Sequence, residues 1–172
     1  LKERIGEHIF GYDDMFLEAV VGKLLVDKGL TIATAESSTG GNIARYITSV
    51  PGSSAYFLGS VIAYSNSIKM SALDVEEQLL MEHGAVSKPV VEAMARGAMK
   101  RLGTRTAIAT SGVAGPDGGT PEKPVGTVWI AVAYDERVYS KVIKFGGHRE
   151  LVIEQASIAA LGLMRKLVQG LL

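Results

Sequence analysis

Hydrophobic positions along the chain follow two different spacings that alternate with each other. Apolar residues recur every three or four positions over 13–28, with Asp13 or Asp14 as a cap and Gly29 as a terminator, which is typical of an amphipathic helix. The same spacing predicts further helices, of which one has Ser87 as its cap. These further helices are predicted over 42–50, 66–73, 75–83, 87–102 and 148–167.

Short apolar and β-branched runs separate the helices and predict strands over 30–35, 55–64, 105–110, 127–134 and 138–145. The run 55–64 is almost continuously apolar, so we expect a strand that is buried on both faces. Only three residues separate the last two strands, which predicts an antiparallel hairpin. The alternation predicts an α/β fold, which we expect to have three layers, α/β/α, around a mixed sheet. Ligands should bind beyond the carboxyl ends of the strands.

The amino-acid composition excludes several functions for a protein with such a fold. The 172 residues suffice for about one domain, and 18 Lys plus Arg balance 18 Asp plus Glu, which argues against a nucleic-acid-binding surface. Cysteine is absent, so covalent catalysis would have to use oxygen, nitrogen or carboxylate groups. Neither a transmembrane pattern nor a signal peptide is evident. We therefore expect a cytoplasmic protein without nucleic-acid or membrane partners.

The first candidate site is the turn 35–41, Ala-Glu-Ser-Ser-Thr-Gly-Gly, between a predicted strand and a predicted helix. Backbone N–H groups in the first turn of a helix have no partners within the helix, so this turn can hold an oxyanion or a phosphate. A plain helix cap assisted by glycine explains the composition equally well. The turn is not a Walker P-loop, because the lysine of that motif is missing.

Other candidate residues also lie at predicted strand ends. In the segment 64–69, Lys69 is either a solvated surface charge or, if it lies beside a partly buried cleft, a base with a lowered pKa. Tyr64 either packs against its neighbours or helps to move a proton. The loop 111–126 contains five glycines, which let backbone approach a ligand, although an ordinary surface loop is the alternative. Arg149, which opens the last helix, either holds an anionic group or faces solvent. Histidines and acidic residues show no metal-ligand spacing, so we expect no metal site.

Several long motifs occur in order and together resemble the C-terminal domain of the CinA family. They are A-E-S-S-T-G-G from residue 35, G-S-S-A-Y-F from residue 52, Y-S-N-S-I-K from residue 64, H-G-A-V-S from residue 83 and S-G-V-A-G-P-D-G-G-T-P-E-K-P-V-G-T-V-W from residue 111. The match runs from about Leu30 to Phe145 and continues less distinctively through the last helix. This domain also occurs alone, as a nicotinamide mononucleotide deamidase.

The resemblance implies hydrolysis of the carboxamide of nicotinamide mononucleotide to nicotinic acid mononucleotide and ammonia, without a cofactor, in pyridine nucleotide salvage. It places the nucleophile on Ser37 and the proton-transfer pair on Tyr64 and Lys69. N–H groups near Thr39 and Gly40 would hold the oxyanion, and the glycine-rich loop, Arg149 or both would hold the 5′-phosphate. The full set of expected substrate-binding residues is Thr39, Gly40, Gly41, Ser111, Gly112, Gly115 and Arg149.

Departures from the family pattern leave a second function open. Ser38 stands where many members have cysteine, and Ser111 stands where they have threonine. Ser67 and Ile68 replace a Glu-Ala pair, which removes a charge close to Lys69. The alternative is a nucleotide-binding or regulatory module with weak catalysis, belonging to a two-domain CinA protein.

The domain organisation follows from the same resemblance. We expect 1–29 to be a linker and a leading helix that pack with the CinA C-terminal domain, 30–172, as one domain. The leading segment resembles the junction that precedes this domain in two-domain members, which would place a further domain before it. Because apolar faces exceed what one small sheet needs and related domains are oligomers, we expect a homodimer.

Overall fold

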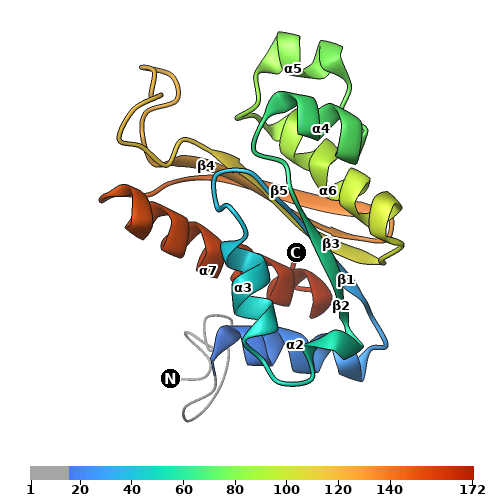
Figure 1. Ribbon diagram of the computed structural model, residues 1–172. Helices are drawn as coiled ribbons and strands as arrows, with labels where there is room; N and C mark the ends of the chain where they lie inside the picture. The colour runs from blue at the N-terminus through green and yellow to red at the C-terminus, as the bar shows by residue number, and fades with distance from the viewer. Residues whose placement is uncertain (1–15) are drawn as a thin grey trace.

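The computed structural model describes residues 16–172, which form one mixed β-sheet between two layers of helices (Figure 1). The elements are α2 (Leu17–Asp27), β1 (Ile32–Glu36), α3 (Asn42–Thr48), η2 (Ser53–Ala55), β2 (Phe57–Ile62), α4 (Asn66–Leu73), α5 (Glu77–His83), α6 (Lys88–Leu102), β3 (Thr106–Gly112), β4 (Thr127–Tyr134), β5 (Arg137–Lys144) and α7 (Arg149–Val168). The expected three-layer α/β/α fold is confirmed. The expected caps Asp13 and Asp14 lie outside the described residues.

The strands are arranged in the order β2-β1-β3-β4-β5. β1 pairs in parallel with both β2 and β3, whereas β3 with β4 and β4 with β5 are antiparallel pairs. The hairpin expected for the last two strands is therefore confirmed. Because β1, β2 and β3 run in the same direction, their carboxyl ends meet at one edge of the sheet, where loops and helix starts gather.

Alternation along the inner strands builds a different core on each face of the sheet. On one face, large side chains such as Ile32, Ile108 and Ile130 pack against α2, α3 and α7. On the other face the strands present mainly alanines to α6 and its neighbours. These alanines are Ala33, Ala35, Ala107, Ala109, Ala131 and Ala133. Small side chains let the layer built around α6 lie close to the sheet, because protein interiors fill their space completely.

The contact between α4 and α6 is equally close, and it predicts a destabilising substitution. A Cβ atom added at Gly97 would lie 2.0 Å from the carbonyl oxygen of Leu73. We expect Gly97→Ala to lower the free energy of unfolding by about 1–3 kcal/mol, because the two helix backbones must separate. Gly162→Ala in α7 is the matched control, since its nearest neighbour is Leu17 at 4.0 Å. Urea denaturation checks both variants, and equal midpoints would contradict the prediction.

One expectation about local structure was wrong, and a second was confirmed only in part. The predicted strand 55–64 is shorter and lies at the edge of the sheet, with Leu58 48% and Ile62 52% exposed. An apolar run does not reveal whether strands flank it on both sides, and β2 pairs with β1 alone. Ser87 does occupy the N-cap position of α6, but its hydroxyl donates to the carbonyl of Gly84 and does not cap the helix.

Candidate active site

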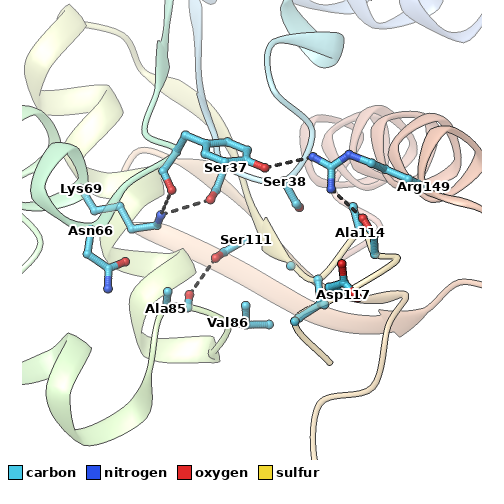
Figure 2. Close-up of a pocket in the computed structure, with 15 residues that line it drawn as sticks. Ser37, Ser38, Asn66, Lys69, Ala85, Val86, Ser111, Ala114, Asp117 and Arg149 are labelled. Atoms are coloured by element: carbon cyan, nitrogen blue, oxygen red, sulfur yellow. Dashed lines mark hydrogen bonds between the residues drawn. The ribbon is translucent and has the colours of Figure 1, made fainter. Parts of the chain in front are cut away.

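A cavity of about 290 Å³ lies at the edge of the sheet where β1, β2 and β3 end. Its walls come from the turn after β1, the segment between β2 and α4, the segment before α6, the loop after β3 and the start of α7 (Figure 2). The lining residues are Ser37, Ser38, Tyr64, Asn66, Lys69, Ala85, Val86, Ser111, Gly112, Val113, Ala114, Gly115, Asp117, Gly118 and Arg149. Segments far apart in the sequence thus meet where a ligand site was expected.

Lys69 and Ser37 form the chemical centre of this cavity. The Lys69 ammonium nitrogen Nζ lies 3.1 Å from Ser37 Oγ, 2.7 Å from the carbonyl oxygen of Ala63 and 3.3 Å from that of Tyr64. The Lys69 side chain is only 1% exposed, and this burial lowers its pKa, because a charged amine loses its hydration. Of the alternatives for Lys69, the structure supports the buried amine beside a cleft and not the solvated surface charge.

The start of α4 explains why a lysine points inward at this place. Ser65 is the N-cap of α4, and its hydroxyl accepts the N–H of Ile68. Lys69 and Leu73 are four residues apart on this helix and share its buried face. Leu73 packs into the core, and Lys69, one turn earlier, reaches the cavity.

The turn that carries Ser37 is fixed from several sides. The Ser37 N–H donates to the carbonyl of Thr110, which continues the pairing of β1 with β3. The side chain of Glu36 folds over the turn and accepts N–H groups at the start of α3. The sequence left a choice between a ligand-binding turn and a helix cap. The structure shows that Glu36 caps the start of α3, while Ser37 and Ser38 of the same turn line the cavity.

Ser38 follows Ser37 and also lines the cavity. Its hydroxyl oxygen is buried and has no hydrogen-bond partner among residues 16–172. Its backbone N–H is likewise without a hydrogen-bond partner in the described part of the chain. Ser38 therefore brings two uncommitted donors to the cavity next to Ser37, and donors in this position can meet developing negative charge.

Arg149 and Tyr64 close one side of the cavity. The Arg149 guanidinium donates to the hydroxyl of Tyr64 at 2.9 Å and to the carbonyl of Gly115 at 2.8 Å (Figure 2). The Tyr64 side chain is 60% exposed, and its backbone carbonyl accepts from Lys69. Arg149 thus joins α7 to the glycine-rich loop and to the segment after β2, with its cationic group at the cavity.

The end of β3 supplies the opposite wall. The Ser111 hydroxyl donates to the carbonyl of Ala85 at 2.7 Å, which ties β3 to the segment before α6. Gly112 and Gly115 also line the cavity, as expected from the sequence. A Cβ atom at Gly112 would lie within 2.9 Å of Val128 and Thr127, so a larger residue cannot occupy this position without moving β4.

The structure does not bring every expected residue to the cavity. Thr39, Gly40 and Gly41 are outside its lining. The Thr39 hydroxyl donates to Glu36, the Gly40 N–H donates to the carbonyl of Ser37, and the Gly41 N–H donates to Glu36. These groups organise the turn itself.

Several lining residues escaped the sequence reasoning. Ser38, Ala85, Val86 and Asp117 lie inside motifs that were recognised, but nothing in their residue types marks them as contacts. Asn66 follows Tyr64 within another of these motifs. Position relative to Ser37 would have singled out Ser38, because the residue after a nucleophile commonly donates its N–H to the oxyanion.

Within residues 16–172, no group of three or more histidine, aspartate or glutamate side chains is placed to hold a metal ion. None of the helices described in this range is both long and apolar enough to cross a membrane.

The fold and the cavity define an α/β domain with a serine and a buried lysine in hydrogen-bond contact. Residues 14–168 match the family model for the CinA C-terminal domain, so the chain belongs to this family. A protein from Klebsiella pneumoniae of the same superfamily has a solved structure that is 33% identical, with a TM-score of 0.87 over 90% of this chain and 96% of that chain. A superfamily member from Escherichia coli is 31% identical, with a TM-score of 0.82 over 94% and 98%.

Sequence relatives have the same family names. A putative competence-damage inducible protein from Symbiobacterium thermophilum is 46% identical over 181 residues, which cover 100% of this chain and 42% of the relative. A CinA-like protein from Parasynechococcus marenigrum is 52% identical over 149 residues, covering 87% of this chain and 36% of the relative. The chain thus spans about two fifths of the length of these relatives.

Proposed function

We propose that this protein hydrolyses the carboxamide of nicotinamide mononucleotide to nicotinic acid mononucleotide and ammonia. The observation that carries the proposal is the contact of 3.1 Å between the buried Lys69 Nζ and Ser37 Oγ. An amide is a poor electrophile, and a serine hydroxyl is too weak a nucleophile at neutral pH without a base beside it. Membership of the CinA family supports the choice of substrate, through the motif resemblance on which that choice depends.

The three oxygen atoms around Lys69 suit both protonation states of its amine. A neutral amine has two N–H bonds and one lone pair, so it can donate to the carbonyls of Ala63 and Tyr64 and present the lone pair to Ser37. After it takes a proton, the ammonium has three N–H bonds for the same three oxygens. The pocket therefore needs no rearrangement when the proton moves, and burial keeps the neutral form accessible.

The reaction then proceeds in two acyl-transfer steps. Ser37 Oγ attacks the carboxamide carbon while Lys69 takes its proton, and Lys69 passes this proton to the departing ammonia. Water attacks the resulting ester, again giving a proton to Lys69, and the Ser37 oxygen leaves with that proton to complete the cycle. The net change is one water consumed and one ammonia released per substrate.

The oxyanion of each tetrahedral intermediate would lie against the Ser38 N–H. This donor belongs to the residue after the nucleophile and is uncommitted among the described residues. The N–H of Gly40 is engaged with the carbonyl of Ser37, so the expectation that it holds the oxyanion gives way to Ser38 in this proposal. A preorganised donor of this kind stabilises charge that develops during the reaction.

Arg149 would hold the phosphate of the substrate. Its present partners, the Tyr64 hydroxyl and the Gly115 carbonyl, are neutral, and a phosphate offers stronger, charge-assisted hydrogen bonds. Arg149 also lies at the side of the cavity where the glycine-rich loop can approach a nucleotide. The proton-transfer role of Tyr64 stays a prediction, since its hydroxyl is bonded to Arg149.

The departures near Lys69 leave its surroundings intact, which disfavours a binding module without turnover. Ser67 is exposed and exchanges a hydrogen bond with the Ser65 hydroxyl. Ile68 is 41% exposed, so neither side chain lies with Lys69 on the buried face of α4. A charge lost at these positions is separated from the amine by the helix backbone and by solvent.

The test is ammonia release by the purified chain with nicotinamide mononucleotide as substrate. We expect ammonia and nicotinic acid mononucleotide to form in equal amounts, because the proposed cycle couples them. Binding by calorimetry without ammonia release would identify the regulatory module instead. Faster release from a different amide would show that the chemistry is right and the substrate wrong.

A further inference from the structure

A fully buried carboxyl group, on Glu36, lies behind the turn that carries Ser37. Both of its oxygens accept hydrogen bonds from main-chain N–H groups. Five donors converge on it, namely the hydroxyls of Thr34 and Thr39 and the N–H groups of Gly41, Ile43 and Ala44. Such a group is costly to bury, and only this set of donors compensates for the lost hydration.

These bonds occupy the N-terminus of α3. The donor–acceptor distances from Gly41, Ile43 and Ala44 are 3.0, 3.1 and 2.8 Å, which are ordinary lengths for such bonds. N–H groups at this position would otherwise attract an anion from the substrate or from solution. Glu36 thereby occupies the N–H groups of Gly41, Ile43 and Ala44, whereas the Ser38 N–H has no partner among the described residues.

The main chain of Glu36 connects to the other half of the catalytic pair. Its carbonyl accepts the N–H of Ala63 at 2.8 Å, and the carbonyl of Ala63 accepts from Lys69 Nζ at 2.7 Å. Ser37 is the next residue along the chain. Glu36 is therefore one covalent step from the nucleophile and two hydrogen bonds from the amine, and its side chain ties the turn to the start of α3.

We propose that Glu36 is a positioning residue for the hydrolysis, which sets the distance between Ser37 Oγ and Lys69 Nζ by fixing the turn 37–41. This inference rests on the proposed function. Glu36 is absent from the lining of the cavity, so it acts through the turn and does not touch the substrate.

The decisive variant is Glu36→Gln, which keeps the shape of the side chain. Its amide nitrogen must face at least one main-chain N–H group, so the variant loses an acceptor and gains an opposed donor. The turn then shifts, and a displacement of about 1 Å lowers a reaction rate about 100-fold. We expect kcat, calculated from the concentration of protein whose Ser37 is reactive, to fall about 100-fold. KM for nicotinamide mononucleotide should change little. Unchanged kcat would overturn the proposal.

A matched control separates positioning from loss of stability. Asn42→Ala removes side-chain bonds from α3 to Glu154 and Ser157 of α7, yet leaves the Glu36 cluster intact. We expect this variant to have a lowered melting temperature and a normal kcat per reactive serine. An equal loss of kcat in both variants would mean that destabilisation of α3 is the cause and would contradict a positioning role.

If Glu36→Gln does not fold, Thr39→Val provides the same test at smaller amplitude. It removes one donor to Glu36, and the Thr39 side chain faces Glu36 and Thr110 and not the cavity. We expect a fall in kcat with little change in KM, smaller than that predicted for Glu36→Gln. A normal kcat in a folded Thr39→Val protein would contradict the proposal.

A substrate-independent readout keeps the two proposals distinguishable. A fluorophosphonate reagent phosphonylates activated serines with release of fluoride, and this reaction with Ser37 needs no nucleotide. Suppose that the wild-type protein releases no ammonia, that its Ser37 reacts rapidly with the reagent, and that Ser37 of Glu36→Gln reacts more slowly. The proposed substrate is then wrong, and the positioning role stands. A Ser37 that reacts equally fast in both proteins overturns the positioning role alone. If Ser37 of the wild-type protein is no more reactive than Ser37 of Lys69→Met, both the proposed function and the positioning role are contradicted.

Discussion

Lys69→Met is expected to abolish nearly all ammonia release while the protein stays folded. Removal of the base leaves Ser37 with its proton, and a general base contributes about 10²–10⁴-fold to such a reaction. Methionine has similar length and suits a buried position, so the layers around α4 should keep their packing. Steady-state assays with melting curves for both proteins measure the two effects. A variant with more than a tenth of the wild-type kcat would remove Lys69 from the mechanism.

The same variant tests the dependence of the reaction on pH. Burial lowers the pKa of Lys69, and the neutral amine is the active form, so kcat/KM of the wild-type protein should rise with pH and level off above this lowered pKa. The folded pKa lies below that of the unfolded chain, about 10.4, so the unfolded state binds more protons between the two values. The contribution of Lys69 to stability therefore increases with pH across this window. Lys69→Met should lack both dependences.

Ser37→Ala is expected to cause the largest loss of activity. It deletes the atom that forms the covalent intermediate, and comparable deletions of nucleophiles lower kcat by on the order of 10⁴-fold or more. The side chain is small and its main-chain bond to Thr110 remains, so neither fold nor substrate binding should suffer. Calorimetry should thus show nicotinamide mononucleotide bound at nearly wild-type affinity without turnover.

Ser49→Ala is the matched control for this deletion. Ser49 lies at the end of α3, and its exposed hydroxyl donates to the carbonyl of Tyr46, away from the cavity. We expect normal kinetics in this variant. Full activity in Ser37→Ala would disprove the nucleophile, and loss of binding together with turnover would indicate that Ser37 acts chiefly in holding the substrate.

Local sequence patterns predicted most of the helices and strands, whereas the roles of Ser37 and Lys69 came from the family resemblance. Strand–turn–helix units place Ser37 after β1, and helical spacing puts Lys69 with Leu73 on one buried face. The contact between Tyr64 and Arg149 joins residues 85 positions apart, so no spacing could predict it. The exposure of β2 depends on which strands flank it, and that is decided by the whole sheet.

Glu36 shows a different limit of sequence reasoning. A glutamate beside serines and glycines resembles an ordinary polar turn residue, whereas here it is completely buried. Its burial follows from the return of α3 over the end of β1, which brings two helix N–H groups and that of the preceding Gly41 to one carboxylate. The preference of helix N-termini for acidic groups was the available signal, but it does not indicate that the acid comes from the preceding strand.

The alanine face of the sheet links the interior to the width of the cavity. α6 packs on these alanines, and the segment that leads into it provides Ala85 and Val86 as one wall of the cavity, pinned by Ser111. A methyl group added under α6 would therefore displace that wall as well as the helix. The volume of these alanine side chains, which do not line the cavity, therefore determines how far apart the two walls of the cavity lie. The interior of the sheet sets the width of the site at its edge.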